Sequence, residues 1–121
     1  MFSAPAIFEG TWLRTNHFLT EAPAAHEKTW LYQPDSGLRW EFLRDRLRSV
    51  GAPTDAEQLR AMLVTGDGEP PVTCVPDLAL PMGQRWASLA TVVLDPVGRR
   101  ADVLDGTPAE TATRPHLALA L

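Results

Sequence analysis

Thr15, Asn16 and His17 stand together where an apolar, strand-like segment gives way to a loop. A side-chain amide beside an imidazole at such a position can donate a hydrogen bond to a developing oxyanion. A donor of this kind can lower the barrier of acyl transfer by roughly 3 kcal/mol. Asn16 and His17 are therefore candidate catalytic residues. The alternatives are that Asn16 caps its own loop backbone and that His17 is a packed histidine bonded to a carbonyl.

The cysteine and the histidines give no further indication of a catalytic or metal site. Cys74 is the single cysteine, and no base or helix start lies near it in the sequence, so we expect a buried structural residue. His17, His26 and His116 lack the spacing of metal ligands on one element, so neither a metal site nor a cofactor is expected.

The clearest predicted helix starts at Asp35 or Ser36, either of which can cap its free amides, and it ends at Gly51. A stripe of apolar side chains marks its buried side: Leu38, Trp40, Phe42, Leu43 and Leu47. Arg39 on this helix either projects to a ligand carboxylate or pairs with Asp35 or Asp45 on the helix surface. Residues 19–35, which precede the helix, are expected to form a surface loop.

A second, short helix is predicted over Thr54–Leu63, with Thr54 and Glu57 forming a capping box. Residues 86–94 are rich in β-branched and apolar side chains, which favours a strand. A turn over 95–98 then allows 101–104 to return as its antiparallel partner.

Ser88 and Thr91 both fall in the predicted strand 86–94. Because they are three positions apart, their side chains face opposite sides of a strand. At most one of the two can therefore line a given pocket.

Length and composition predict one domain over residues 1–121. The predicted elements place it in the α+β class, with a small, mostly antiparallel sheet and two short helices on one face. The net charge of -4 leaves no basic stripe for a nucleic-acid partner. The first residues lack the basic segment and apolar core of a signal peptide. No apolar run approaches the roughly 18 residues of a membrane span, so a cytoplasmic protein is expected.

Several of these segments, in this order, resemble the C-terminal part of acyl-CoA:6-aminopenicillanate acyltransferase-like proteins, which belong to the N-terminal-nucleophile (Ntn) hydrolases. The segments are Thr15–Phe18, Ser36–Arg39, Thr54–Leu63, Ser88–Pro96 and Asp105–Pro108. Each is short, and their order and spacing carry the resemblance. It spans residues 8–108 and leaves 109–121 as a weakly specified tail.

The resemblance implies a role for several residues. Asn16 is expected to help form the oxyanion hole. Ser36 and Arg39 resemble a pair near the site that orients the catalytic centre. Ser88 and Thr91 would lie on a central strand of the family's αββα sandwich, near the substrate pocket. Arg39, Ser36, Ser88 and Thr91 are therefore the expected substrate-binding residues, and a small molecule is the expected substrate.

The sequence departs from the family at the nucleophile. Family members use a cysteine that self-cleavage makes N-terminal, and its free α-amine acts as the base. This chain begins Met1-Phe2-Ser3, and the bulky second residue is expected to block removal of the initiator methionine, so Ser3 should not become residue one. The chain is expected to hold the half of an Ntn fold that lacks the nucleophile.

Half of a sandwich exposes a sheet surface that needs a cover, so we expect a homo-oligomer or a complementary Ntn-half subunit as partner. Two functions stay open. One is a subunit of an amide hydrolase or acyltransferase whose nucleophile comes from another chain. The other is a protein that binds a small molecule, or acts on it without covalent catalysis, through Asn16, His17 and Arg39.

Overall fold

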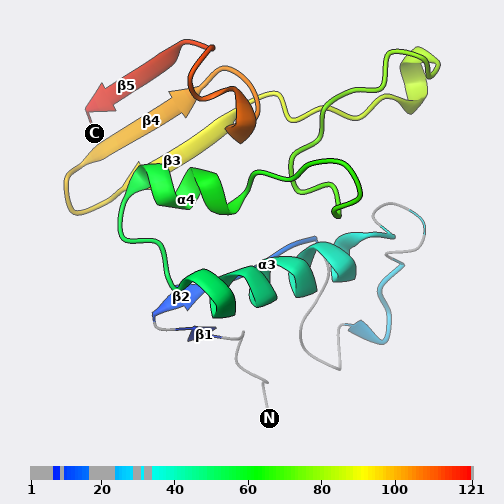
Figure 1. The fold of residues 1–121 in the computed structure, drawn as a ribbon, viewed down its shortest axis with the longest axis horizontal. Helices are drawn as coiled ribbons and strands as arrows, with labels where there is room; N and C mark the ends of the chain where they lie inside the picture. The colour runs from blue at the N-terminus through cyan, green and yellow to red at the C-terminus, as the bar shows by residue number, and fades with distance from the viewer. Residues whose placement is uncertain (1–6, 9, 17–23, 29–30, 32–33, 121) are drawn as a thin grey trace. The chain divides into compact units, whose positions relative to one another are not determined.

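The computed structural model describes residues 7–8, 10–16, 24–28, 31 and 34–120 (Figure 1). Its contacts divide the chain into two compact units, Met1–Pro53 and Thr54–Leu121. The described residues contain two helices and a three-stranded antiparallel sheet, so the α+β class is confirmed. The association of the two units into the expected single domain, 1–121, stays a prediction. None of the helices in these ranges has the length and apolar character needed to cross a membrane.

The first unit contains a short strand pair and the longer helix. Strands β1 (Ile7–Phe8) and β2 (Thr11–Trp12) pair antiparallel around Gly10, whose φ of 83° suits the tight connection because glycine has no Cβ. Helix α3 spans Ser36–Val50, and the amide of Gly51 closes its last turn on the carbonyl of Leu47. The predicted bounds of this helix are therefore confirmed, but the Asp35 side chain makes no capping hydrogen bond.

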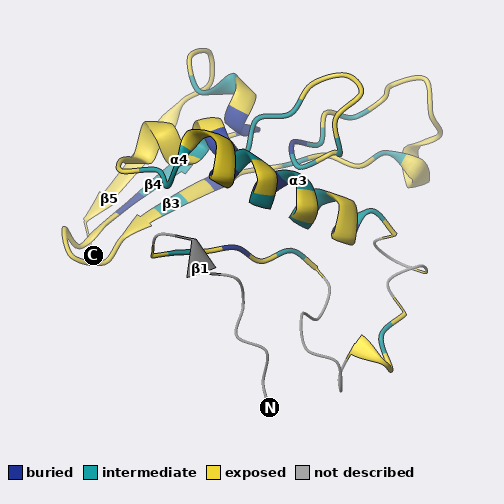
Figure 2. Cartoon of the chain, turned by 60° about the horizontal axis from the view of Figure 1, so that its bottom comes forward, coloured by how far each residue is buried: buried dark blue, intermediate teal, exposed yellow. Residues whose placement is uncertain are grey.

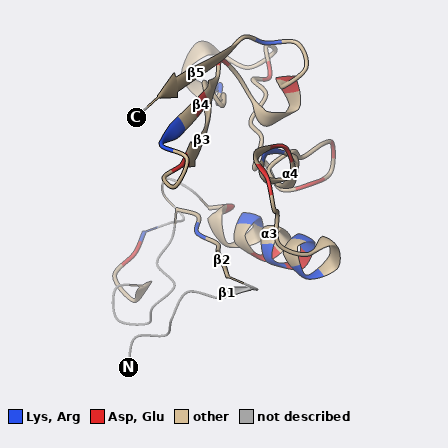
Figure 3. Cartoon of the chain, turned by 90° about the vertical axis from the view of Figure 1, so that its left-hand side faces the viewer, with Lys and Arg blue, Asp and Glu red and all other residues tan. Residues whose placement is uncertain are grey.

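The buried side of α3 is narrower than the sequence predicts. Leu43 and Leu47, four residues apart, are buried, whereas Leu38 is 61% exposed. Most of α3 is exposed or half-buried (Figure 2). Arginines shield two of the aromatic rings, since Arg44 lies 5.2 Å from the centre of the Trp40 ring. The other pair is Arg46 over Phe42, at 4.3 Å. Figure 3 shows basic and acidic positions interspersed along α3.

The second unit begins with helix α4 (Ala56–Met62), whose capping differs from the prediction. Asp55, not Thr54, is the cap, and its carboxylate accepts from the Gln58 amide at 2.8 Å. The Gln58 side chain reaches back and accepts from the Thr54 amide at 3.0 Å. The predicted Thr54–Glu57 capping box is wrong, because the Asp55 carboxylate takes the cap position one residue later.

Three antiparallel strands follow in the order β3 (Thr91–Asp95), β4 (Arg100–Leu104) and β5 (His116–Ala120). The predicted hairpin of β3 and β4 is confirmed, but β3 begins at Thr91 and residues 86–90 are not part of it. The tail that the sequence left unspecified supplies β5, the strand beside β4 (Figure 1).

The two faces of this sheet differ in character. Helix α4 is tied to one face by Arg60, whose guanidinium contacts the Asp102 carboxylate at 2.7 Å. Leu104, on the same face as Asp102, is 1% exposed. The opposite face carries only apolar side chains: Val92, Leu94, Ala101, Val103, Leu117 and Leu119. We call these six residues the apolar sheet face.

Candidate functional site

Ser36, the first residue of α3, is hydrogen-bonded to the segment that follows β2. Its hydroxyl accepts a hydrogen bond from the Asn16 backbone amide at 2.8 Å and donates to the Thr15 hydroxyl at 3.1 Å. The Thr15 hydroxyl in turn donates to the Ser36 carbonyl at 3.0 Å. Ser36 is 0% exposed, so these bonds are formed away from solvent. The geometry makes Ser36 a residue that positions Asn16.

Arg39 holds the side chain of Asn16. The Arg39 Nη2 donates to Asn16 Oδ1 at 3.0 Å, and Arg39 Nε lies 3.2 Å from the Asp35 carboxylate one helical turn earlier. The Arg39 side chain is only 13% exposed. Of the alternatives open for Arg39, the pair with Asp35 is present. The same guanidinium therefore connects a carboxylate on the helix with an amide on the preceding segment.

The contact with Arg39 determines which way the Asn16 amide faces. A guanidinium has only donors, so the atom it binds must be the carbonyl oxygen of the amide. The NH2 group of Asn16 then points away from Arg39, and in the part of the chain that the structure describes it has no hydrogen-bond partner. Asn16 itself is exposed. The cluster of Thr15, Asn16, Ser36 and Arg39 thus presents an oriented, accessible pair of N–H donors.

The structure brings together three of the predicted site residues, Asn16, Ser36 and Arg39, all within the first unit. His17 lies outside the described residues. Ser88 and Thr91 belong to the second unit.

Ser88 and Thr91 have different surroundings in that unit. Ser88 pairs with Cys74: its amide donates to the Cys74 carbonyl at 2.8 Å, and its hydroxyl accepts from the Cys74 amide at 3.1 Å. Ser88 also lines a cleft. Thr91 is buried, and its hydroxyl donates to the Gly106 carbonyl at 3.0 Å. Cys74 is half-buried, rather than buried as expected, and its thiol contacts the Pro71 carbonyl at 3.3 Å.

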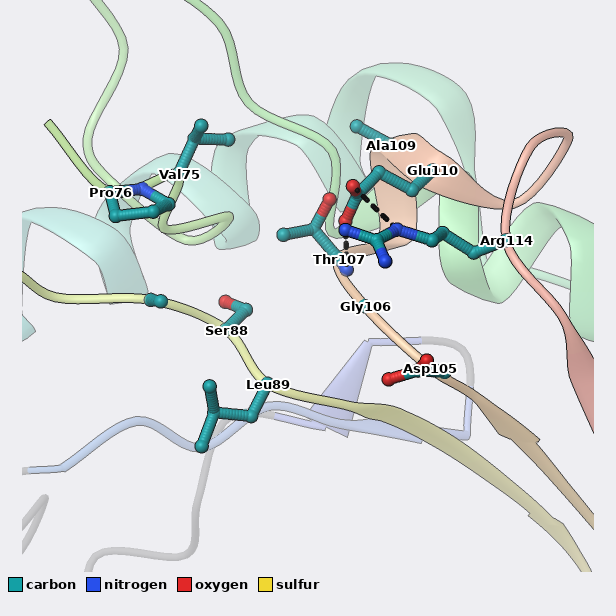
Figure 4. A pocket seen from close by; sticks show the side chains of 11 residues that line it. Val75, Pro76, Ser88, Leu89, Asp105, Gly106, Thr107, Ala109, Glu110 and Arg114 are labelled. Carbon is teal, nitrogen blue, oxygen red and sulfur yellow. Dashed lines mark hydrogen bonds and ion pairs between the residues drawn. The ribbon is translucent and has the colours of Figure 1, made fainter. Parts of the chain in front are cut away.

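The cleft beside Ser88 has a volume of about 400 Å³ and is formed entirely by the second unit (Figure 4). The turn after β4 forms its polar side. There the Glu110 carboxylate accepts from the Thr107 amide at 2.8 Å and from Arg114 Nε at 3.1 Å. The Thr107 amide, followed by Arg114, lowers the pKa of the Glu110 carboxyl below its ordinary value. Glu110 therefore stays ionised at neutral pH and fixes Arg114.

Gly106 allows this arrangement of the turn. Its φ is 140°, and a Cβ at this position would lie 2.5 Å from a Glu110 carboxylate oxygen. Any side chain here would displace Glu110 from the Thr107 amide. The close approach of the Glu110 carboxylate and the positive φ therefore both favour glycine at position 106.

The sequence analysis gives no role to the three residues that form the polar side of the cleft, which are Asp105, Glu110 and Arg114. In the Asn16 cluster it names Asp35 as a possible partner of Arg39, but it gives Thr15 no bond to Ser36. Thr107 followed three residues later by Glu110 is the spacing of a capping box, a signal that could have identified the turn. Nothing local in the sequence indicates that Asn16 and Arg39 meet.

The chain has no match among protein-family profiles, curated proteins or solved structures. Groups of three or more metal-ligating side chains are absent from the ranges that the structure describes.

Proposed function

We propose that the chain is the non-nucleophile part of a small-molecule amide hydrolase or acyltransferase of the Ntn type, and that the Asn16 amide stabilises the oxyanion. One observation carries the proposal: Arg39 Nη2 donates to Asn16 Oδ1 at 3.0 Å, which directs the Asn16 N–H groups outward. A pre-oriented donor is what an oxyanion hole requires, because no reorganisation is then needed when charge develops.

The chemistry assigned to Asn16 is the following. A cysteine thiolate adds to the carbonyl of an amide, and the carbonyl oxygen becomes the oxyanion that Asn16 binds. Collapse breaks the C–N bond, the leaving amine takes the proton that the thiol gave to the base, and a thioester remains. Water then releases the acid, or a second amine takes the acyl group. Asn16 acts in both steps, since each passes through a tetrahedral oxyanion.

The nucleophile in this proposal comes from outside the Asn16 cluster. Ser36, a serine bonded directly to the Asn16 amide, is fully buried, and its hydroxyl is bonded to Thr15. Cys74 belongs to the other unit. By similarity to the family, an N-terminal cysteine of a complementary Ntn half would supply the thiolate and its α-amine the base.

The apolar sheet face is a second observation in favour of a complementary half. Four of its six side chains are exposed by 42% to 62%: Val92, Leu94, Leu117 and Leu119. An aligned face of this character buries itself against a second sheet in sandwich folds. We assign this cover to the complementary half or to a second copy of the chain, which would complete the αββα arrangement that the resemblance implies.

A second function has its own support. The hydroxyls of Thr15 and Ser36, which stand next to Asn16, are bonded to each other, so the cluster offers donors without an activated nucleophile. Binding of a small carbonyl or carboxylate compound by Asn16, without covalent catalysis, fits the same geometry.

The deciding experiment combines this chain with the polypeptide encoded immediately upstream and follows release of p-nitroaniline from N-acyl p-nitroanilides. Turnover is expected only with both halves. Asn16→Ala should lower kcat by about 100- to 1,000-fold with little change in KM. Gln84→Ala removes an exposed side-chain amide elsewhere and should change neither.

Two results would count against the proposal. An unchanged kcat in folded Asn16→Ala protein would overturn the oxyanion role. Binding of the anilides by this chain alone, with no turnover in either arrangement, would favour the second function.

A further inference from the structure

The cleft of the second unit combines an apolar wall with two charged groups that have spare bonding capacity. Val75, Pro76 and Leu89 lie on one side, and Asp105 and Arg114 lie on the other (Figure 4). Its volume of about 400 Å³ falls within the range of small-molecule sites. The cleft therefore has the size and the amphipathic lining of a binding site.

Among the described residues, Arg114 is bonded through Nε alone, so its two terminal nitrogens remain available as donors. Glu110 accepts from Arg114 Nε at 3.1 Å, which fixes the guanidinium plane. The two terminal nitrogens of Arg114 have no partner in the described part of the chain. Together they present the planar fork that binds a carboxylate through two parallel hydrogen bonds.

Asp105 supplies the opposite charge. Its backbone amide donates to the Pro115 carbonyl at 3.2 Å, which anchors the residue, while its carboxylate has no partner among the described residues. Since Arg114 and Glu110 offset each other's charge, Asp105 leaves the cleft with a net negative charge. That charge excludes a simple anion as the best ligand and favours one that also carries an ammonium group.

We propose that this cleft binds a free apolar amino acid. The α-carboxylate pairs with the terminal nitrogens of Arg114, the α-ammonium pairs with Asp105, and the side chain packs on Val75, Pro76 and Leu89. The Ser88 hydroxyl, which accepts from the Cys74 amide at 3.1 Å, keeps its proton available as a donor to the same carboxylate.

Every residue of the cleft lies in the second unit, so binding there is measurable whether or not Asn16 acts on amides. The probe is L-leucine, titrated into the full chain while backbone amide NMR shifts are followed. The expected shifts are at Ser88, Leu89, Gly106 and Thr107.

Three analogues test the three contacts on the unaltered chain. N-acetyl-leucine lacks the ammonium and leucinamide lacks the carboxylate, and each should bind roughly tenfold more weakly than leucine. Glycine lacks the apolar side chain and should give no shifts at the same concentrations.

Variants assign the contacts to residues. Arg114→Gln and Asp105→Asn should each weaken leucine binding roughly tenfold. The matched controls Arg100→Gln and Asp67→Asn, at exposed positions outside the cleft, should leave it unchanged. Because Arg114 also bonds Glu110, the analogue series remains decisive if Arg114→Gln disturbs the turn.

The proposal is overturned if N-acetyl-leucine or leucinamide binds as tightly as leucine. It is equally overturned if leucine at millimolar concentration moves no resonance of the cleft, or moves only resonances outside it.

Discussion

Arg39 Nη2 donates a hydrogen bond to Asn16 Oδ1 at 3.0 Å, although the two residues lie 23 positions apart in the chain. The helix thereby controls the orientation of an amide that belongs to the segment after β2. The same guanidinium also pairs with Asp35. Arg39 therefore links the Asn16 amide to the start of the helix.

Arg39→Gln should release the Asn16 side chain. Asn16 is the single asparagine of the chain, so its NH2 resonances can be identified by their loss in Asn16→Ala. In Arg39→Gln these resonances should move toward the positions of a free amide, because the oxygen loses a charge-assisted bond. Two-dimensional 1H–15N spectra measure the change. Arg48→Gln, an exposed arginine on the same helix, serves as the control, and unchanged Asn16 signals in Arg39→Gln would contradict the assignment.

Ser36→Ala should destabilise the first unit. The substitution leaves the Asn16 backbone amide and the Thr15 hydroxyl without the buried Ser36 oxygen that they contact. An unsatisfied group of this kind costs about 1–3 kcal/mol of unfolding free energy. Urea unfolding measures it, with Ser49→Ala at an exposed position of α3 as the matched control. Equal stabilities of the two variants would show that Ser36 does not hold the cluster.

Glu110 should make the turn after β4 sensitive to acid. Its pKa is lowered in the folded state by the Thr107 amide and by Arg114, so its contribution to stability is complete above the unfolded value of 4.5. That contribution is lost as the pH falls through the lower, folded pKa. Glu110→Gln should therefore unfold at lower urea concentration than wild type at neutral pH, and the difference should shrink on acidification.

Chemical denaturation at a series of pH values from about 6 to 3 covers this window. Asp67→Asn removes an exposed carboxylate that has no partner in the described ranges, and it should show no such convergence. A gap between Glu110→Gln and wild type that stays constant with pH would contradict the role of the charge.

Local sequence rules recover those parts of the fold that depend on neighbouring residues. The bounds of helix α3 follow from its apolar pattern and from Gly51, and the β3–β4 hairpin follows from β-branched residues around a turn. Local rules fail where two candidates compete, as Thr54 and Asp55 do for the cap of α4. They also overlook β5, because Leu117 and Leu119 become a strand only by pairing with β4.

The Asn16 cluster shows the same limit for the site. Residue types and a family resemblance select Asn16, Ser36 and Arg39 separately. Their hydrogen bonds join positions 20 to 23 apart, and no spacing rule predicts contacts of that range. The cleft depends even more on tertiary structure, since Val75, Ser88 and Arg114 meet only after the chain has folded. Contacts between segments that are distant in the sequence therefore determine which residues come together in the cluster and in the cleft.

The apolar sheet face should be the surface through which the protein associates. Leu94 on β3 and Leu117 on β5 are 62% and 58% exposed and lie toward opposite edges of this face. Leu94→Lys and Leu117→Lys each place a charge where a second apolar layer is expected, and burying an unpaired charge is costly.

Light scattering should give a mass above the 13.3 kDa of one chain for the wild type, and a mass near that value for either variant. If the complementary half is the natural cover, both variants should weaken its binding by at least roughly tenfold. Leu78→Lys alters a leucine that is 72% exposed outside the sheet and should change neither measurement. A wild-type mass of one chain, both alone and with the complementary half, would refute this use of the face.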